Sequence, residues 1–251
     1  GGKVYSWGAS YSGQLGRNIQ DNSSHYEPIA VFGRGGHGTL SGAIDVATST
    51  DSSAILLADG SIWVFGENDK GQLGTGSSAP YEKNIVKMED LDNVVKIAGG
   101  SKNFVAIDTA GYGYIWGDDD ASQIANMEAL SGGTSGMIKS PKRIEIGSTP
   151  LEDIIDIAVG GGTLSGKRTT HVAAVNLEGG VYTWGSGANG KLGDNSNENR
   201  RRPTKIAIPH GGNMTAMAVA AGNEHTGAIT SDGQVWAWGL NDSSQLGNHS
   251  D

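Results

Sequence analysis

The chain has 251 residues, 41 of them glycine and none cysteine, with a net charge of −9 at pH 7 and a pI near 5.1. The lack of cysteine excludes disulfides, thiolate catalysis and thiolate metal sites, and the acidic balance argues against a nucleic-acid-binding protein, which needs a basic stripe. No apolar run approaches the ~18 residues of a membrane-spanning helix. Because the glycines fall at turns and follow no collagen period, the composition favours an all-β, loop-rich protein.

One short motif occurs five times along the chain. Each copy has an aromatic residue followed by Gly, and seven residues after the aromatic comes Gln or Lys followed by Leu or Ile. The spacing between copies is that of a repeated multi-strand unit. The chain is therefore predicted to be a single repeat domain over residues 1–251, or a fragment of one. The motifs lie at residues 7–16, 65–74, 116–125, 184–193 and 238–247.

Apolar runs around each motif predict four antiparallel strands per repeat, and four such strands form a β-propeller blade. Turns such as Asp59-Gly60 and Asp232-Gly233 supply the positive φ of a tight hairpin between the second and third strands. The expected first strands are 44–47, 95–98, 155–158 and 217–220, and the second strands are 54–57, 104–107, 171–175 and 226–229. The third strands are 62–65, 114–116, 181–184 and 235–238, and weaker fourth strands are expected at 27–31, 84–86, 141–144 and 203–206.

The stretch from Ala220 to Gly247 resembles the repeats of the regulator of chromosome condensation almost throughout. It contains a Gly-x-x-His turn at Gly222 to His225, then Asp-Gly, a strand ending in Trp-Gly, and Gln-Leu-Gly. Other copies depart from that pattern, since Phe65 replaces the tryptophan and an insertion, 162–170, precedes His171. The resemblance implies a seven-bladed β-propeller and activity as a guanine-nucleotide exchange factor for a Ran-like small GTPase.

About five blade units are visible in the sequence. The first unit begins at its third strand and the last stops after its Gln-Leu-Gly loop, so joining the two ends would duplicate a strand. We therefore expect a fragment or a trimmed chain with further blades outside the given sequence, or a nonstandard closure. The expected core comprises Trp7, Phe65, Trp116, Trp184, Trp238, Leu15, Leu73, Leu192 and Leu246.

Several patterns that suggest chemistry have simpler structural explanations. Residues 161–168 contain the G-x-x-x-x-G-K of a phosphate-binding loop, but Arg168 stands where Ser or Thr must hold Mg²⁺ and a strand follows, so a projecting hairpin is expected. The run Asp118-Asp119-Asp120 lacks calcium-loop spacing and is interpreted as a solvated loop. His225 is expected to pack and hydrogen-bond towards a neighbouring blade, and Trp63 and Trp236 to be partly exposed at a blade edge. We predict no catalytic residue, metal site or cofactor.

The repeats differ most in three segments, residues 33–42, 121–140 and 160–170, and variable loops on a rigid scaffold commonly carry recognition. Arginine and methionine are enriched in interface cores. The predicted partner-binding residues are Arg34, Met137, Lys139, Lys167 and Arg168. The basic stretch from Arg200 to Lys205 is interpreted as charges that protect an exposed strand edge, and it is the alternative binding patch.

Three functions remain open from the sequence. The favoured one is a non-enzymatic protein-recognition propeller that binds a macromolecular partner through its face loops. The second is the exchange factor for a small GTPase that the resemblance implies. The third is a bacterial or viral adhesin or inhibitor that binds a cell-surface receptor, favoured by the absence of cysteine and the many Asn, Ser and Gly residues. The third hypothesis carries the expectation of a secreted or surface-exposed protein without membrane insertion.

Overall fold

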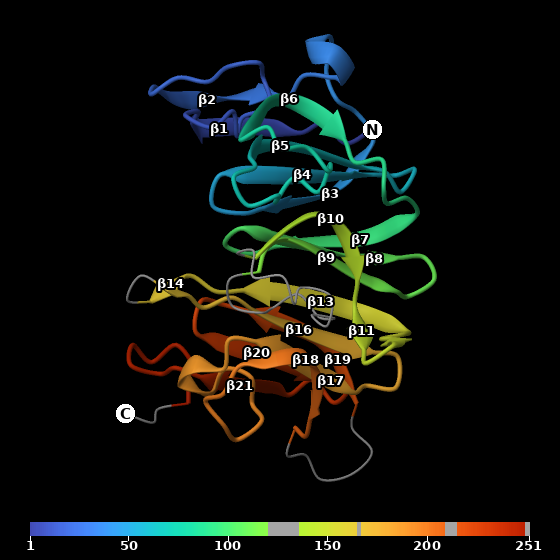
Figure 1. Ribbon diagram of the computed structural model, residues 1–251, viewed down its shortest axis with the longest axis vertical. Helices are drawn as coiled ribbons and strands as arrows, with labels where there is room; N and C mark the ends of the chain where they lie inside the picture. The colour runs from blue at the N-terminus through green and yellow to red at the C-terminus, as the bar shows by residue number, and fades with distance from the viewer. Residues whose placement is uncertain (120–135, 165–166, 209–214, 249–251) are drawn as a thin grey trace. The chain divides into compact units, whose positions relative to one another are not determined.

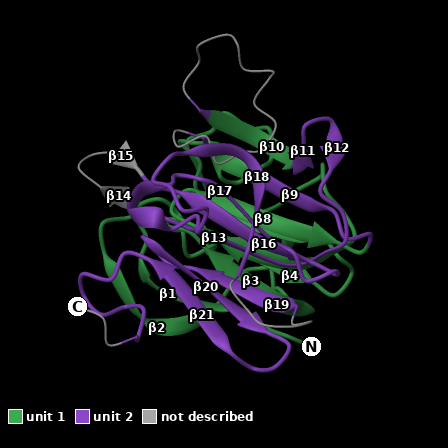
Figure 2. Cartoon of the chain, turned by 90° about the horizontal axis from the view of Figure 1, so that it is seen from below, with its two compact units in different colours: residues 1–109, 116–118, 137–142 green, residues 110–115, 119–136, 143–251 purple. Residues whose placement is uncertain are grey.

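The computed structural model describes residues 1–119, 136–164, 167–208 and 215–248, in which almost all regular structure is antiparallel β-sheet (Figure 1). The chain divides into two compact units (Figure 2). Unit 1 comprises residues 1–109, 116–118 and 137–142, and unit 2 comprises residues 110–115, 119–136 and 143–251. No helix in these described ranges is long and apolar enough to cross a membrane.

Three sheets have four strands each, in the sequential order of a propeller blade. Blade 2 comprises β3 (Ala43–Thr48), β4 (Ser52–Leu57), β5 (Ile62–Glu67) and β6 (Tyr81–Lys87). Blade 3 comprises β7 (Val94–Gly99), β8 (Asn103–Asp108), β9 (Gly113–Asp118) and β10 (Met137–Arg143). Blade 4 comprises β13 (Ile154–Gly160), β16 (His171–Asn176), β17 (Val181–Gly185) and β18 (Arg200–Ile206).

Two further sheets contain part of a blade, and the remaining elements are short. Blade 1 has two strands, β1 (Tyr5–Ala9) and β2 (Ser24–Ala30), and blade 5 has three, β19 (Ala216–Ala221), β20 (His225–Thr230) and β21 (Val235–Gly239). The connections contain the hairpins β11 (Glu145–Ile146) with β12 (Thr149–Pro150) and β14 (Thr163–Leu164) with β15 (Lys167–Arg168), and the 3-10 turns η1 (Arg34–Gly36) and η3 (Ala188–Gly190). The predicted strands and their order within each blade are confirmed.

The glycine after each aromatic residue has a specific backbone role. At Gly8, Gly66 and Gly185 the pairing of the third strand with the fourth shifts register, and these glycines have φ of +109°, +104° and +100°. An extra residue with positive φ in one strand is a β-bulge, which glycine adopts without steric cost. A Cβ atom at Gly66 would also lie 2.3 Å from the carbonyl oxygen of Asp51. The aromatic-Gly pair therefore marks the point where the third strand bends into its loop.

The buried core follows the repeated motif in most blades. Phe65, Trp116 and Trp184 are buried, as are Leu15, Leu73 and Leu192, as predicted. The Trp116 ring stacks on Phe104 with centroids 6.1 Å apart, and its indole N–H donates to the carbonyl of Gln72 at 3.0 Å.

Three predicted core residues are not buried. Trp7 is 60% exposed, and Trp238 and Leu246 are partly exposed. The buried aromatic Trp116 is covered both by the second strand of its own blade and by the Gln-Leu-Gly step of the repeat before it. Trp7 lies in a sheet of two strands, and among the described residues neither kind of cover lies over its ring.

Candidate functional site

Each blade presents two kinds of connection at its two ends. Because successive strands are antiparallel, the turn between first and second strands and the loop between third and fourth strands lie at the same end. We call this end the loop face. The hairpin between second and third strands and the connection to the next blade lie at the opposite end. The inserted hairpin β14–β15 follows a first strand and so belongs to the loop face of blade 4.

The predicted partner-binding residues fall into two groups. Met137 and Lys139 begin the fourth strand of blade 3, and Lys167 and Arg168 form β15, so all four belong to loop faces. Arg34 begins η1, after the fourth strand of blade 1, and therefore lies at the end opposite the loop face. The topology thus separates Arg34 from the other four.

Arg34 contacts an aromatic ring within unit 1. Its guanidinium carbon lies 5.3 Å from the centroid of Trp63, a distance typical of a cation–π contact. Trp63 is 9% exposed, and its indole N–H donates to the hydroxyl of Ser61. The prediction that Trp63 is partly exposed was wrong, because η1 places the arginine against its ring, whereas Trp236 is partly exposed as predicted.

Met137 and Lys139 differ in how they are held. The Lys139 ammonium donates to the hydroxyl of Ser78 at 2.7 Å, and the Lys139 carbonyl accepts from the amide of Gly76 at 2.8 Å. Lys139 is therefore fixed to the loop of blade 2. Met137 is 39% exposed and offers an apolar contact beside it.

The constant spacing of the Gln-Leu step among the repeats of this chain has a local explanation in the loop. The side-chain oxygen of the glutamine accepts the backbone N–H two residues before it, at 2.8 Å, in Gln14, Gln72 and Gln245. This bond folds the loop back on itself and positions the following leucine. Lysine has no acceptor, so Lys191 cannot make the same bond.

Charged residues in the turn of one blade contact the loop of the blade before it. Lys102, in the first turn of blade 3, forms ion pairs of 2.8 Å with Glu67 and with Asp69 of blade 2. Burial alone lowers the pKa of Lys102, but hydrogen bonds and charge from the two carboxylates outweigh burial and raise it. Asp51, in the first turn of blade 2, accepts from the Tyr11 hydroxyl of blade 1, which raises the pKa of that phenol. These pairs fasten neighbouring blades at the loop face.

In unit 2 the corresponding contact is buried and involves the inserted hairpin. The side chain of Lys191 is fully buried, and its ammonium donates to the carbonyl of Thr169 at 2.6 Å and to Glu224 at 2.8 Å. The hydroxyl of Thr169 also donates to Glu224, and the amide of Asn189 donates to it at 3.2 Å. Burial lowers the pKa of Lys191 despite the opposing effect of Glu224.

This cluster anchors the base of the hairpin. The amide of Thr169 donates to the carbonyl of Gly162 at 3.0 Å and closes the base of the insertion. β14 pairs with β15 in antiparallel register, Thr163 opposite Arg168, so the predicted hairpin is confirmed in the backbone. Lys191 and Glu224 were missed from the sequence. The sequence did contain a hint of this contact. The one repeat with lysine in place of glutamine is also the repeat that carries the insertion just before His171.

His171 has the interblade role that was predicted for His225. His171 begins the second strand of blade 4, is completely buried, and its Nε2 lies 2.7 Å from the hydroxyl oxygen of Thr226 on blade 5. That hydroxyl donates its single hydrogen to the carbonyl of Lys191, so Nε2 of His171 must be the donor to it. Burial lowers the pKa of His171 to about 3, with smaller effects from Lys191 and His225. His225 itself is half-buried and packs its ring against Gly222.

The acidic run after β9 is largely buried. Asp118 is 0% and Asp119 4% exposed, and the ammonium of Lys70 lies 3.7 Å from the Asp118 carboxylate. The prediction of a solvated loop was wrong for these two residues, because β9 continues through Asp118 and the Asp118 amide is bonded to the carbonyl of Lys102. Asp120 lies outside the described residues. In the described part of the chain, no three His, Asp or Glu side chains are grouped as metal ligands would be.

The outer edge of blade 4 carries the basic stretch from Arg200 to Lys205. β18 is the last strand of its sheet, as predicted for charges that protect an edge. Arg200 is paired with Asp194 at 2.6 Å, whereas Arg201, Arg202 and Lys205 are exposed.

Comparison with known proteins agrees with this architecture. The chain is 26% identical over 250 residues to the human E3 ubiquitin-protein ligase HERC2, covering 98% of this chain and 5% of HERC2. Human WBSCR16 matches with a TM-score of 0.76 and 22% identity, covering 97% of this chain and 58% of that one. Prp20p from Saccharomyces cerevisiae, whose structure was described together with its binding properties to Gsp1p and histones, matches with a TM-score of 0.72 and 23% identity over 98% of this chain and 55% of Prp20p.

The chain thus spans little more than half the length of the solved structures it matches, and a small part of HERC2. The family model described as the regulator of chromosome condensation (RCC1) repeat matches residues 1–56, 59–107 and 178–229, and a second model of the same repeat matches residues 218–245. These matches cover more than half of the chain and coincide with the aromatic-Gly blades described above. The chain belongs to the RCC1 repeat family of β-propellers.

Proposed function

We propose that this chain is a non-enzymatic protein-recognition module that binds a macromolecular partner through the loop faces of its blades. The observation that carries the proposal is the anchored hairpin β14–β15, which forms a two-stranded sheet of its own and is joined to blade 5 through Thr169, Lys191 and Glu224. A hairpin held at its base loses little conformational entropy on binding, and preorganisation of that kind increases affinity.

The proposed contact residues are Met137, Lys139, Lys167 and Arg168, with Arg34 as a separate contact at the opposite end of blade 1. Lysine and arginine on an otherwise acidic chain would pair with acidic groups of the partner, and Met137 would supply apolar area. The charged residues in the turns, such as Lys102 and Asp51, are already engaged between blades and serve the scaffold.

The test uses three recombinant probes, Gsp1p, core histones and Kap60, because yeast relatives were described with these proteins. Binding to the whole chain is measured by biolayer interferometry. The variant with Lys139, Lys167 and Arg168 all changed to Ala should weaken binding at least tenfold, whereas the matched edge variant with Arg201, Arg202 and Lys205 changed to Ala should not. If only the edge variant weakened binding, the binding site would lie at the outer edge of blade 4 instead. Binding that neither triple variant alters, or no binding to any probe, would contradict the proposal.

The second candidate function is guanine-nucleotide exchange on a small GTPase. It is favoured by membership of the RCC1 family and by the relation to Prp20p, which was described with its binding to Gsp1p. The test is release of a fluorescent GDP analogue from a panel of small GTPases in the presence of the chain. Accelerated release from one of them, lost when Glu224 is changed to Gln to loosen the hairpin base, supports exchange, and release at the intrinsic rate throughout the panel rejects it.

The adhesin hypothesis receives no support from the relatives. The most similar proteins described above come from human and yeast, and the plant relative RUG3 is described as mitochondrial. A secreted bacterial or viral origin is therefore the least favoured of the three hypotheses.

A further inference from the structure

One arginine in the loop of blade 1 is buried without a counter-charge. Arg17 follows directly after the Gln-Leu-Gly step of that blade and is 5% exposed. Two of its side-chain nitrogens, Nε and Nη2, are buried and make no hydrogen bond in the described structure. Burial lowers the pKa of Arg17, and no carboxylate among the described residues opposes that effect. Because arginine stays protonated in proteins, its positive charge is unfavourable where it lies.

The residues on either side of Arg17 fix its place between two blades of unit 1. A Cβ atom at Gly16 would lie 3.0 Å from the ring of Phe65, and the amide of Asn18 donates to the carbonyl of Lys83 at 2.9 Å. This stretch of the loop therefore packs on β5 and β6, two strands of the complete blade 2. Since the loop joins the third and fourth strands of its repeat, Arg17 belongs to the loop face.

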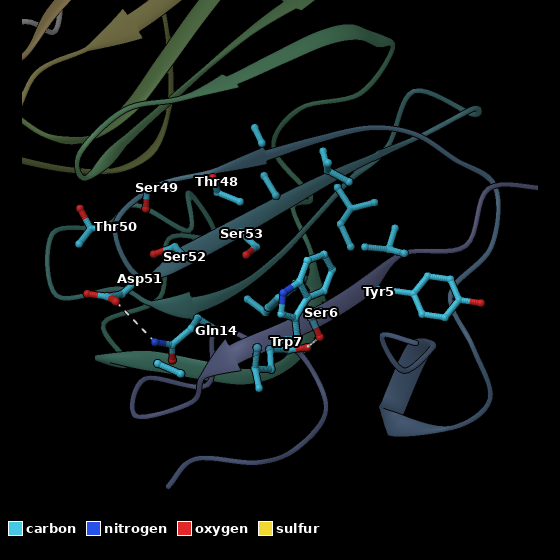
Figure 3. A pocket seen from close by; sticks show the side chains of 18 of the residues that line it. Tyr5, Ser6, Trp7, Gln14, Thr48, Ser49, Thr50, Asp51, Ser52 and Ser53 are labelled. Atoms are coloured by element: carbon cyan, nitrogen blue, oxygen red, sulfur yellow. Dashed lines mark hydrogen bonds between the residues drawn. The ribbon is translucent and has the colours of Figure 1, made fainter. Parts of the chain in front are cut away.

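The acidic residue in the first turn of blade 2 is engaged by other side chains of the same loop. Asp51 accepts from the hydroxyl of Tyr11 and, at 3.4 Å, from the side-chain amide of Gln14, which Figure 3 shows pointing toward it. The loop of blade 1 thus meets the turn of blade 2 through Tyr11 and Gln14. Arg17 has no ion pair in the described part of the chain.

The same position of the repeat holds an ion pair in blade 4. Asp194 follows the Lys191 step there as Arg17 follows the Gln14 step, and its carboxylate accepts from Nε of Arg200 at 2.6 Å. The counterpart of Arg200 in blade 1 is His25, because both pair with the glycine of the aromatic-Gly step, and His25 contacts Asp21. Both members of the pair in blade 4 come after the third strand, so the first two strands of a repeat take no part in it. Blade 1 therefore supplies an arginine at this position without a carboxylate.

We propose that Arg17 binds the carboxylate of an acidic side chain on the partner polypeptide. Nε and Nη2 form one edge of the guanidinium, which is the edge that donates two parallel hydrogen bonds to a carboxylate, and both are unused here. Of the side-chain nitrogens only Nη1 reaches solvent. Binding therefore turns the unused edge outward and replaces an unpaired buried charge by a bidentate pair. The source of the carboxylate rests on the proposed function, since Arg17 lies on the loop face.

The test follows the Nε–H signal of Arg17 in proton–nitrogen correlation spectra of the whole chain. The signal is identified by its loss in Arg17→Thr, a variant that copies Thr75 at the same position of blade 2. The probe is a short acetylated peptide that alternates glycine and glutamate, and the control peptide carries glutamine in place of glutamate. We expect a saturable shift of the Arg17 signal with the glutamate peptide and at least a tenfold weaker affinity for the glutamine peptide. The glutamate peptide should also raise the melting temperature of the wild type more than that of Arg17→Thr.

The matched control variant is Arg143→Thr, because Arg143 is exposed and already has a carboxylate, that of Glu145, at 3.9 Å. It should leave the shift of the Arg17 signal unchanged. The variant with Lys139, Lys167 and Arg168 changed to Ala should also keep that shift, so failure of the Arg17 site and failure of the proposed contact residues give different results.

Three outcomes would overturn the proposal. They are no saturable shift of the Arg17 signal, equal shifts with the two peptides, and an equal rise in melting temperature for the wild type and Arg17→Thr. Inorganic phosphate is the last probe. A saturable shift with phosphate but none with the glutamate peptide would identify phosphate as the ligand and would also overturn the carboxylate assignment.

Discussion

The buried imidazole of His171 predicts a specific dependence of stability on pH. Its Nε2–H donates to Thr226, and in the described structure its Nδ1 is buried without a hydrogen-bond partner. Protonation would place a hydrogen on Nδ1 with no acceptor, close to the positive charge of Lys191 and near His225. The folded chain therefore holds His171 neutral, with a pKa of about 3 against an ordinary value of 6.5.

The sign and size of the effect follow from proton linkage. Between pH 6.5 and pH 3 the unfolded chain binds a proton at His171 that the folded chain does not bind, so the free energy of unfolding falls as the pH is lowered. The loss is about 1.4 kcal/mol per pH unit, which gives about 2 kcal/mol at pH 5 and about 5 kcal/mol over the whole interval. Above pH 6.5 His171 becomes neutral in the unfolded chain as well, so its contribution to the free energy of unfolding no longer changes with pH.

The substitution His171→Asn removes this titration and has a precedent within the chain. Asn103 occupies the same position in blade 3, where its side-chain amide donates to the carbonyl of Trp116. Urea unfolding followed by circular dichroism at pH 7, 6 and 5 should give a smaller decrease for the variant than for the wild type, by about 2 kcal/mol at pH 5.

His37→Asn is the control, since His37 is exposed and should leave the difference unchanged. NMR titration of the His171 ring in the folded chain provides a second measurement, in which its signals should not shift between pH 7 and 5. Identical pH profiles for the wild type and His171→Asn, together with a ring that titrates near pH 6, would refute the assignment of His171 as a neutral interblade donor.

Two further predictions compare residues at equivalent repeat positions. Trp116→Ala should lower the free energy of unfolding by ~3–5 kcal/mol because the ring is buried, whereas Trp7→Ala should change it by no more than ~0.5 kcal/mol. Equal losses in urea unfolding would show that the exposure of the ring does not determine the cost of removing it. Gly193→Ala should destabilise by ~1–3 kcal/mol more than Gly247→Ala, because a Cβ at Gly193 would lie 2.7 Å from the Trp238 ring and one at Gly247 would meet nothing within 4 Å. Both glycines have positive φ, +71° and +67°, so the backbone strain caused by alanine largely cancels when the melting curves of the two variants are compared. Equal shifts of the two melting temperatures would contradict the ring contact as the cause.

The blades were predictable from sequence because their determinants are local. Alternating apolar runs and Asp-Gly turns specify strands and hairpins without reference to distant residues. In the structure, Gly60 has a φ of +81° and the hydroxyl and amide of Ser61 both donate to Asp59, as such a turn requires. The aromatic-Gly spacing was equally informative, since the bulge it encodes occurs in blades 1, 2 and 4.

Burial at the repeat position was less predictable because it depends on the neighbouring blade. Trp7 and Trp116 occupy the same position of the repeat, yet one is 60% and the other 0% exposed. The difference comes from the second strand and the Gln-Leu-Gly step that cover the Trp116 ring, whereas in the described part of the chain neither covers Trp7. A position in a repeat therefore predicts which face a side chain occupies, whereas its burial requires knowledge of the blade that packs on it.

The polar junctions were the hardest part to predict, because residues of different charge fill the same place. Lys102 in the turn of blade 3 meets carboxylates in the preceding loop, whereas Glu224 in the turn of blade 5 meets the ammonium of Lys191. In these two junctions a positive group meets a negative one and either side supplies either charge, whereas Asp51 in the turn of blade 2 accepts from the neutral hydroxyl of Tyr11. The repeats of this chain therefore share no residue type in the turn, which carries Asp51, Lys102 or Glu224, although each contact links two blades. In blade 4, Lys191 stands in place of the glutamine and donates both to Thr169 at the base of the inserted hairpin and to Glu224 of blade 5. The residue that departs from the repeat pattern is therefore the one that positions the proposed recognition element.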